Sequence, residues 1–317
     1  MSSIEPAFGK PNPERLRHNM LRFLTETWEK GSLAPVRELM HPDLIDHNPL
    51  PGTASGREGY EQTIGIFRAG LSDMRMQMLH QLVEGDTAVD HWAATAVHTG
   101  PFAGVPATGK TLSMHGLNIG RFENGVIVER WAQVNMMDLL QQLGAVPGGT
   151  EPVPPLEIPA LERGQTTPEQ NKALVQRLTE EVWNQGKLEL IPEIYHALSV
   201  APDVPQLPTG PTGTEFAVRT FRAAFPDFHM TAEHLLAEGD FVVARFRQQG
   251  THQGDLFGIP ATGKKVDFEE IALLQFAEGK VIATWYETDM MGLMGQLGVG
   301  GAAPTDDSGE KTPGATA

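Results

Sequence analysis

The stretch Gly-Val-Pro-Ala-Thr-Gly-Lys at residues 104–110 returns as Gly-Ile-Pro-Ala-Thr-Gly-Lys at residues 258–264, 154 positions later. Further pairs keep the same offset on both sides of this stretch, or one residue more far upstream: His98 with His252, Trp131 with Trp285, and Trp28 with Trp183. Each unit spans about 135 residues, an ordinary domain size, whereas solenoid repeats are far shorter. The sequence therefore predicts two domains that arose by internal duplication.

The composition narrows the class of protein and of partner. The chain has 317 residues, of which 40% are hydrophobic and 20% charged, as is typical of globular proteins. Its net charge of −16 argues against nucleic acid or an anionic membrane as a partner. The chain has no cysteine, which excludes disulfides and thiolate metal sites. There is no apolar run of membrane-spanning length and no apolar leader at residues 1–13, so we expect a cytoplasmic protein.

Within each unit the hydrophobic pattern changes from helical to alternating. In the first unit it predicts helices over 13–31, 33–40 and 56–71, a turn-rich loop over 41–49, strands over 74–82, 87–98, 112–122 and 126–135, and a closing helix over 137–143. Helices followed by hairpin-linked strands are typical of an α+β fold with a curved antiparallel sheet. Such a sheet encloses a pocket when helices cover its concave face.

Proline, glycine and polar residues mark the boundaries of the two units. We predict a first domain over 12–145, a proline-rich linker over 146–166, a second domain over 167–299 and a disordered tail over 300–317. Asn12-Pro13 and Thr167-Pro168 each read as a helix cap followed by proline at the first helical position.

Several motifs in this order resemble the SnoaL-like family of polyketide and ester cyclases, in the nuclear transport factor two-like superfamily. The pieces that carry the resemblance are residues 41–49, 98–100, 104–110 and 121–125 with Trp131 and 142–144 in the first unit, and 251–254, 258–264, Phe276, Gly279, Lys280, Trp285 and 296–298 in the second. The resemblance implies two tandem cone-shaped α+β barrels, each with three N-terminal helices and an apolar pocket. It says little about the reaction, because this superfamily hosts many activities.

The family's polyketide cyclases are expected to close rings by aldol chemistry without metal or cofactor. By the resemblance they use an Asp directly after the Trp of the last strand, assisted by a His on the neighbouring strand. Here the two Asp positions hold Ala132 and Tyr286, and the helper positions hold Asn118 and Ala272. That route to the reaction is therefore missing from both copies.

The first unit keeps polar residues that are candidates for an alternative site. We predict His47 as an acid or base oriented by Asp43 or Asp46, with Arg130 and Asn118 polarising a carbonyl group. An ordinary loop-capping role for His47 and Asp43 is the alternative. Trp92 and His98 are further substrate-binding candidates, although the retention of His98 in both copies favours a structural hydrogen bond.

The second unit has lost the His–Asp pair, since residues 197–205 replace that loop, and we expect it to be degenerate. We expect Phe122 to pair with Val126 in the hairpin of the first unit. The same register in the equivalent hairpin of the second unit places Glu270 near Tyr286 on the cavity face. There Glu270 is either a buried carboxyl group with a raised pKa or a solvated one bonded to the tyrosine. Trp131 and Trp285 each lie on the outer face of their own sheet, away from the cavity. This predicts that the two units pack through these faces as an intramolecular pseudo-dimer, and it leaves further homo-oligomerisation open.

Other chemistry finds little support in the sequence. The histidines lack metal-ligand spacing, and the Gly-Ile-Pro-Ala-Thr-Gly-Lys stretch lacks the strand and helix of a phosphate loop, so we expect no metal and no cofactor. The leading hypothesis is a cofactor-independent enzyme that cyclises, isomerises or hydrolyses a hydrophobic small molecule. The alternatives are a non-catalytic binding module for such a ligand and a pure interaction scaffold.

Overall fold

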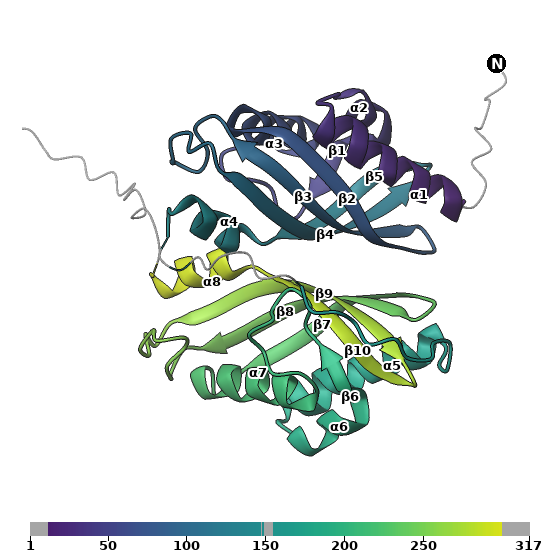
Figure 1. The fold of residues 1–317 in the computed structure, drawn as a ribbon, viewed down its shortest axis with the longest axis vertical. Coiled ribbons are helices and arrows are strands. Elements are labelled where there is room, and N and C mark those ends of the chain that lie inside the picture. The colour runs from purple at the N-terminus through teal and green to yellow at the C-terminus, as the bar shows by residue number, and fades with distance from the viewer. Residues whose placement is uncertain (1–11, 147, 149–154, 300–317) are drawn as a thin grey trace, which may run out of the picture.

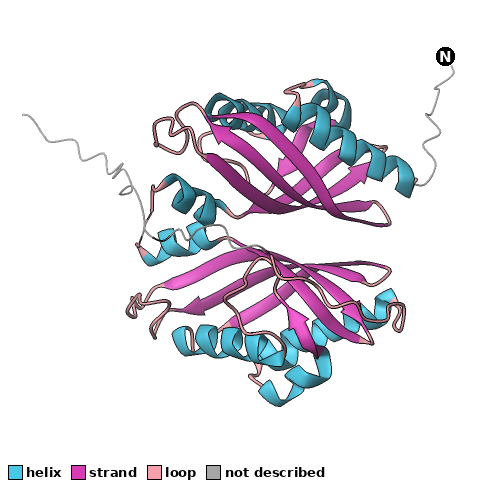
Figure 2. Cartoon of the chain, in the orientation of Figure 1, coloured by secondary structure: helices cyan, strands magenta, loops and turns pink. Residues whose placement is uncertain are grey.

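The computed structural model describes residues 12–146, 148 and 155–299. They form two units of similar build, each with one five-stranded sheet (Figure 1). The sheets face each other across the middle of the molecule, and the longer helices cover their outward sides (Figure 2). Among the described residues, none of the helices is long and apolar enough to cross a membrane.

The first unit begins with a broken helical layer and continues into its sheet. Its elements are α1 (Pro13–Arg22), η1 (Phe23–Glu29), α2 (Ala34–Leu39), β1 (Met40–Asp46), α3 (Gly56–Gly70), β2 (Leu71–Glu84), β3 (Thr87–His98), β4 (Thr111–Glu123), β5 (Val126–Val134) and α4 (Met136–Leu143). The strand order is β1-β5-β4-β3-β2.

The second unit repeats this plan in the same order. Its elements are α5 (Pro168–Arg177), η2 (Leu178–Asn184), η3 (Leu188–Leu190), α6 (Ile191–Ile194), β6 (Tyr195–Val200), α7 (Pro211–Ala224), β7 (His229–Glu238), β8 (Phe241–Thr251), β9 (Lys265–Ala277), β10 (Lys280–Thr288) and α8 (Met290–Leu297). Its strand order, β6-β10-β9-β8-β7, mirrors that of the first unit. The predicted α+β duplication is confirmed.

The structure shows the capping hydrogen bonds that the sequence predicted at the helix starts. Asn12 Oδ1 accepts from the backbone N–H groups of Glu14 and Arg15, and Thr167 forms a complete capping box with Gln170. The closing helices α4 and α8 end at Gly144 and Gly298, whose positive φ angles an L side chain rarely adopts.

Most of the segment predicted as a loop over 41–49 is in fact a strand, since β1 extends to Asp46. β1 pairs in parallel with β5, and β6 does the same with β10, so each sheet is mixed and not wholly antiparallel. The segment contains residues that are typical of turns, which led to the prediction of a loop. A strand can contain them here because it is irregular. Its register shifts between Met40, opposite Ile127, and Ile45, opposite Glu129.

The hairpin between β4 and β5 also differs from the expected register. The turn has two residues, Asn124 and Gly125, both at positive φ, and Glu123 pairs with Val126. A register shift after Arg121 then places Asn118 opposite Ala132, two residues from the expected partner. Because side chains alternate with period two, this shift leaves the same residues on the cavity face.

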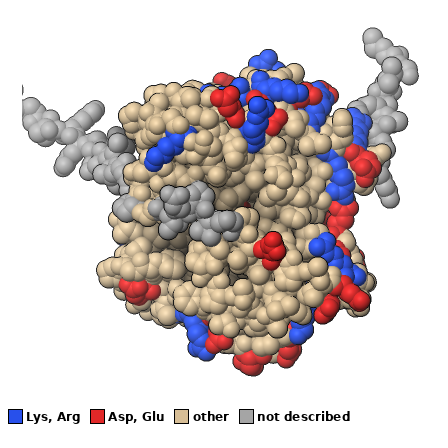
Figure 3. All heavy atoms as spheres, in the orientation of Figure 1, with Lys and Arg blue, Asp and Glu red and all other residues tan. Residues whose placement is uncertain are grey.

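The facing surfaces of the two sheets join in one apolar cluster. Trp131 and Trp285 both belong to it, together with Leu82, Val89, Leu117, Ile119, Leu236, Val243, Ile271, Leu273 and Ala283. Polar contacts cross the same interface: His115 Nδ1 with Glu287, Arg17 with Glu238, and Lys172 with Glu84. On the face shown in Figure 3, charged side chains of both signs lie mainly toward the upper, right and lower edges.

Candidate functional site

The first unit encloses a cavity of about 680 Å³ between its helices and its sheet. Most of its wall is apolar and rich in methionine and aromatic side chains, such as Met20, Trp28, Phe67, Met74, Met76, Trp92 and Met114. Polar side chains enter from the sheet and from the segment after β1, namely Asp46, His47, Asn48, Asp90, Asn118 and Arg130. An apolar cavity with few converging polar groups is typical of a small-molecule site.

Three neighbouring strands present their cavity-facing positions at the same level. Asp90 on β3 lies opposite Asn118 on β4, and Asn118 lies opposite Ala132 on β5. Asn118 and Ala132 are the positions that match the helper His and the catalytic Asp of the family's aldol cyclases. A carboxyl group therefore does enter the cavity at this level, but from β3.

Asp90 is the most perturbed carboxyl group of the cavity. Only 2% of the residue is exposed, and Oδ1 accepts a hydrogen bond from Gln81 Nε2 at 2.9 Å. Burial, only partly opposed by this bond, raises the pKa of Asp90 to about 7. The sequence motifs did not point to this residue. The available signal was an Asp inside a strand of Ala, Val and Trp, where Asp is otherwise rare.

Arg130 is held in the cavity wall by three neighbours. Nη1 donates to Asp46 Oδ2 at 2.7 Å, Nη2 donates to Asn118 Oδ1 at 3.4 Å, and the guanidinium carbon lies 4.6 Å from the centre of the Tyr60 ring. Since both Asp46 and Arg130 are largely buried, the pair is fixed in orientation. The predicted grouping of Arg130 with Asn118 is present in the structure.

His47 reaches the cavity rim, but its partner is neither Asp43 nor Asp46. Its Nε2 lies 2.9 Å from Glu129 Oε1, and its ring stacks on Trp131 with centroids 4.7 Å apart. Asp43 is exposed and lies outside the cavity wall, while Asp46 pairs with Arg130. The expected pairing fails because this segment is a strand whose residues diverge, not a compact loop.

The two remaining candidates of the first unit have different positions. Trp92 lies in the cavity wall against Gly116, and its buried Nε1 has no hydrogen-bond partner among the described residues. His98 is fully buried outside the cavity wall, where Nδ1 accepts from the Thr108 backbone N–H at 3.2 Å. His252 holds Thr262 in the same way. This geometry is that of a structural hydrogen bond that fixes the repeated Gly-rich loop.

The cone of the second unit is filled with side chains. The counterparts of Asp90, Asn118, Arg130, Ala132 and Met114 there are, in turn, Ala244, Ala272, Thr284, Tyr286 and Phe268. Most of these belong to a large core that also contains Phe225, Phe228, Phe246 and Phe276. Polar cavity groups have thus given way to small residues, and bulky aromatic ones occupy the space.

Glu270 and Tyr286 do not form the predicted neighbouring pair across the strands. Glu270 lies opposite Thr288, and Tyr286 lies opposite Ala272. Glu270 Oε2 accepts from Thr288 Oγ1 at 2.7 Å and from Gln248 Nε2 at 3.1 Å, and burial raises the pKa of Glu270. Both predicted roles for Glu270 had Tyr286 as its neighbour, but its hydrogen-bond partners are Thr288 and Gln248.

Comparison with known proteins identifies the family. The family model for SnoaL-like polyketide cyclase matches residues 18–143 and again 173–297. The aklanonic acid methyl ester cyclase DnrD of Streptomyces peucetius is 32% identical over 130 residues, covering 39% of this chain and 88% of that protein. Among solved structures, TsrD of Streptomyces laurentii is 26% identical, covering 43% of this chain and 99% of that one, with a TM-score of 0.40. Wild-type IdmH of Streptomyces antibioticus is 31% identical, covering 40% and 97%, with a TM-score of 0.37. The chain belongs to the SnoaL-like polyketide cyclase family and carries two copies of its unit.

Proposed function

We propose that the first unit is a cofactor-independent cyclase that closes a ring in an apolar, polyketide-like small molecule. The observation that carries this proposal is Asp90, a buried carboxyl group in the wall of an apolar cavity with its pKa raised to about 7. A carboxyl group with a pKa near the working pH can both accept and return a proton. The second unit, with its filled cone, takes no part in the chemistry.

The reaction that suits this geometry is an intramolecular aldol addition. The Asp90 carboxylate takes a proton from a carbon between carbonyl groups, and the electron pair of that C–H bond forms a new C–C bond to a second carbonyl carbon. The oxygen of that carbonyl then receives the proton from Asp90. The product is an isomer of the substrate, so the step needs no oxidant, reductant or co-substrate.

Arg130 and Asn118 supply the electrophilic side of this proposal. Both residues line the cavity, Asn118 from β4, one strand from Asp90, and Arg130 from β5, two strands from it. Because Asp46 and Tyr60 fix the guanidinium group, its N–H groups are preorganised for a carbonyl oxygen that gains negative charge. Trp92, whose Nε1–H has no hydrogen-bond partner in the part of the chain that the structure describes, can donate to a further oxygen of the ligand.

The test uses aklanonic acid methyl ester, the substrate named for the relative DnrD, with product detection by mass spectrometry and ultraviolet absorbance. We expect turnover by the wild-type chain and a loss of at least a hundredfold in kcat for Asp90→Asn. Asp86→Asn, in the exposed turn before β3, is the matched control and keeps full activity. Equal turnover by wild type and Asp90→Asn would reject the assigned role.

The non-catalytic binding module is the second candidate, favoured by Ala132 and Tyr286 at the family's Asp positions. It predicts that the wild-type chain binds a polycyclic ligand without converting it. It also predicts that Asp90→Asn binds that ligand as well as wild type does. Tight binding together with an unchanged substrate mass after prolonged incubation would favour this candidate over the cyclase.

A further inference from the structure

Part of the cavity wall of the first unit comes from the second unit. Residues Thr288, Asp289, Met290, Met291 and Gly292, at the end of β10 and the start of α8, line the same cavity as Asp90 and Arg130. The helices α4 and α8 lie side by side at this end of the molecule (Figure 1). Met290 and Met291 add apolar surface to the wall of this cavity.

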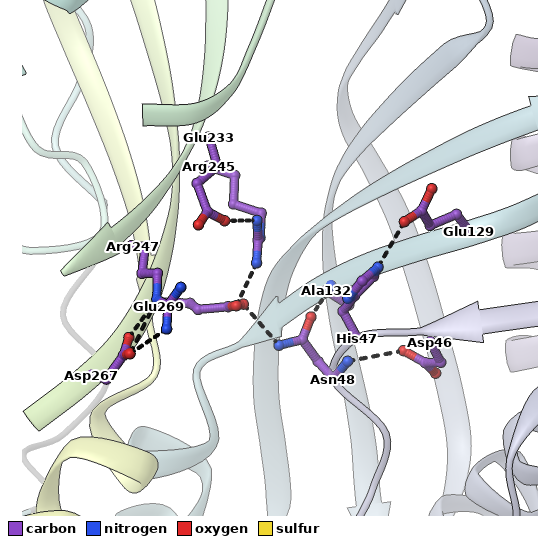
Figure 4. Close-up of polar contacts among 10 residues, drawn as sticks. All are labelled: Asp46, His47, Asn48, Glu129, Ala132, Glu233, Arg245, Arg247, Asp267 and Glu269. Carbon is purple, nitrogen blue, oxygen red and sulfur yellow. Dashed lines mark hydrogen bonds and ion pairs between the residues drawn. The ribbon is translucent and has the colours of Figure 1, made fainter. Parts of the chain in front are cut away.

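A chain of hydrogen bonds links the second unit to the segment that follows β1. The backbone N–H of Ala132 donates to Asn48 Oδ1 at 2.9 Å, and Asn48 Nδ2 donates to Glu269 Oε2 at 3.1 Å (Figure 4). Glu269 is itself bonded to the buried Arg245, which also binds Glu233. The Glu269 carboxylate, which accepts the hydrogen bond from Asn48, is therefore held in place by Arg245 of its own unit.

The direction of these bonds determines which group position 269 requires. Because Asn48 Oδ1 accepts from a backbone N–H, the amide cannot turn round, and Nδ2 must find an acceptor. Arg245 likewise offers only donors. Both oxygens of the Glu269 carboxylate are thus in use, and an amide at this position would leave one donor without an acceptor.

The consequence reaches the cavity through the neighbours of Asn48 in sequence. The Asn48 backbone N–H donates to Asp46 Oδ1 at 3.2 Å, and Asp46 Oδ2 holds Arg130. At the position equivalent to Glu269, the first unit has His115, which contacts Glu287 instead. Among the described residues, the linkage from Glu269 through Asn48 to Asp46, called the brace below, is therefore found only on the side of the molecule that has the cavity.

We infer that the second unit completes the active site of the first, with Glu269 as a positioning residue and Met290 and Met291 as specificity-determining wall residues. This inference rests on the proposed function, because that function supplies the class of ligand that the cavity binds. It does not depend on catalysis. In this arrangement Glu269 acts on Arg130 through Asn48 and Asp46, and touches no ligand.

The brace is tested with Glu269→Gln and the control Asp267→Asn in the full chain. Asp267 lies two residues earlier on the same strand, where its exposed carboxylate binds Arg247 and makes no hydrogen bond to the described residues of the first unit (Figure 4). The probe is 1,8-dihydroxyanthraquinone, with binding followed by quenching of tryptophan fluorescence. We expect five- to tenfold weaker binding for Glu269→Gln and wild-type affinity for the control.

A double-mutant cycle and hydrogen exchange separate positioning from a general structural effect. If Glu269 acts through Asn48, then Glu269→Gln changes affinity little once Asn48→Ala is present. Without any ligand, exchange of the backbone amides over residues 46–50 should accelerate in Glu269→Gln and not in Asp267→Asn. Additive effects in the cycle, or unchanged exchange in both variants, would overturn the positioning role.

The wall is tested with Met291→Ala and the control Gly295→Ala, which adds a methyl group to open space on the same helix. We expect Met291→Ala to weaken the three-ring probe at least threefold more than the two-ring probe 1,5-dihydroxynaphthalene. Equal affinity ratios in wild type and Met291→Ala, or no probe binding at all, would overturn the wall role. Probe binding without turnover would remove only the proposed reaction and leave these ratios valid.

Discussion

Asp90 brings a buried carboxyl group into the cavity from β3. The family's catalytic position, Ala132 here, has lost its acid, and Asp90 lies at the same level two strands away. No fixed spacing in sequence links β3 to the tryptophan of β5, so a motif search around Trp131 misses it. The physical signal lies in its burial, which becomes visible only when the sheet is assembled.

The pH dependence of the reaction follows from this residue. The base form of Asp90 exists above its pKa of about 7, so kcat/KM should rise tenfold per pH unit below 7 and level off above it. Initial rates between pH 5 and 9 measure this profile. A rate that stays flat down to pH 5 would show that a more acidic group is the base.

The stability of the protein should depend on Asp90 in a defined direction. Its pKa is raised from 3.8 to about 7, so the folded state keeps a proton that the unfolded state releases, and the free energy of unfolding falls as pH rises through this range. Asp90→Asn does not titrate, and its stability relative to wild type should therefore grow with pH, by up to roughly 4 kcal/mol at pH 8. Urea unfolding at pH 4.5 and pH 8 measures the change. A constant difference at both pH values would contradict the raised pKa.

At the scale of elements, β4 carries a glycine whose small size shapes the cavity. A Cβ at Gly116 would lie 2.7 Å from both the Gln133 carbonyl oxygen and Trp92 Cζ2. Gly116→Ala should therefore displace Trp92 and lower the free energy of unfolding by about 1–3 kcal/mol. Gly120→Ala, on the same strand and face, meets its nearest atom at 3.6 Å and should be tolerated. Thermal unfolding of both variants compares them, and equal losses would count against this packing argument.

The elements also show where sequence patterns suffice and where they do not. Strand alternation placed β3 at residues 87–98 with the observed bounds, and the cap residues Asn12 and Thr167 marked both helix starts. The parallel strand β1 was missed because its register shift and its Pro42 resemble a loop. The cavity face was nevertheless predicted correctly, since an error of two residues in register preserves alternation. The partner of His47 could not be predicted, because Glu129 is 82 residues away.

At the scale of the whole molecule, the cavity lies in the first unit, whereas most of the equivalent positions in the second unit belong to a packed core. We therefore expect one molecule of 1,8-dihydroxyanthraquinone bound per chain, as measured by isothermal titration calorimetry. Arg130→Ala in the first unit should weaken this binding, whereas Thr284→Ala at the equivalent position of the second unit should not. A stoichiometry of two would show that the second cone opens to ligands.

The seam between the two sheets has a consequence for how this protein can change. In a symmetric pair of identical subunits, every substitution at the contact appears on both sides at once. Here Glu269 and His115 occupy equivalent places but differ, because both halves are encoded in one chain. Each half can be altered independently, and the two are always made in equal amounts and held at high local concentration. Because the two units are linked in one chain, the two sides of this two-fold-like contact can take different roles. The second unit can then be changed to alter ligand choice while the sequence of the unit that holds Asp90 stays the same.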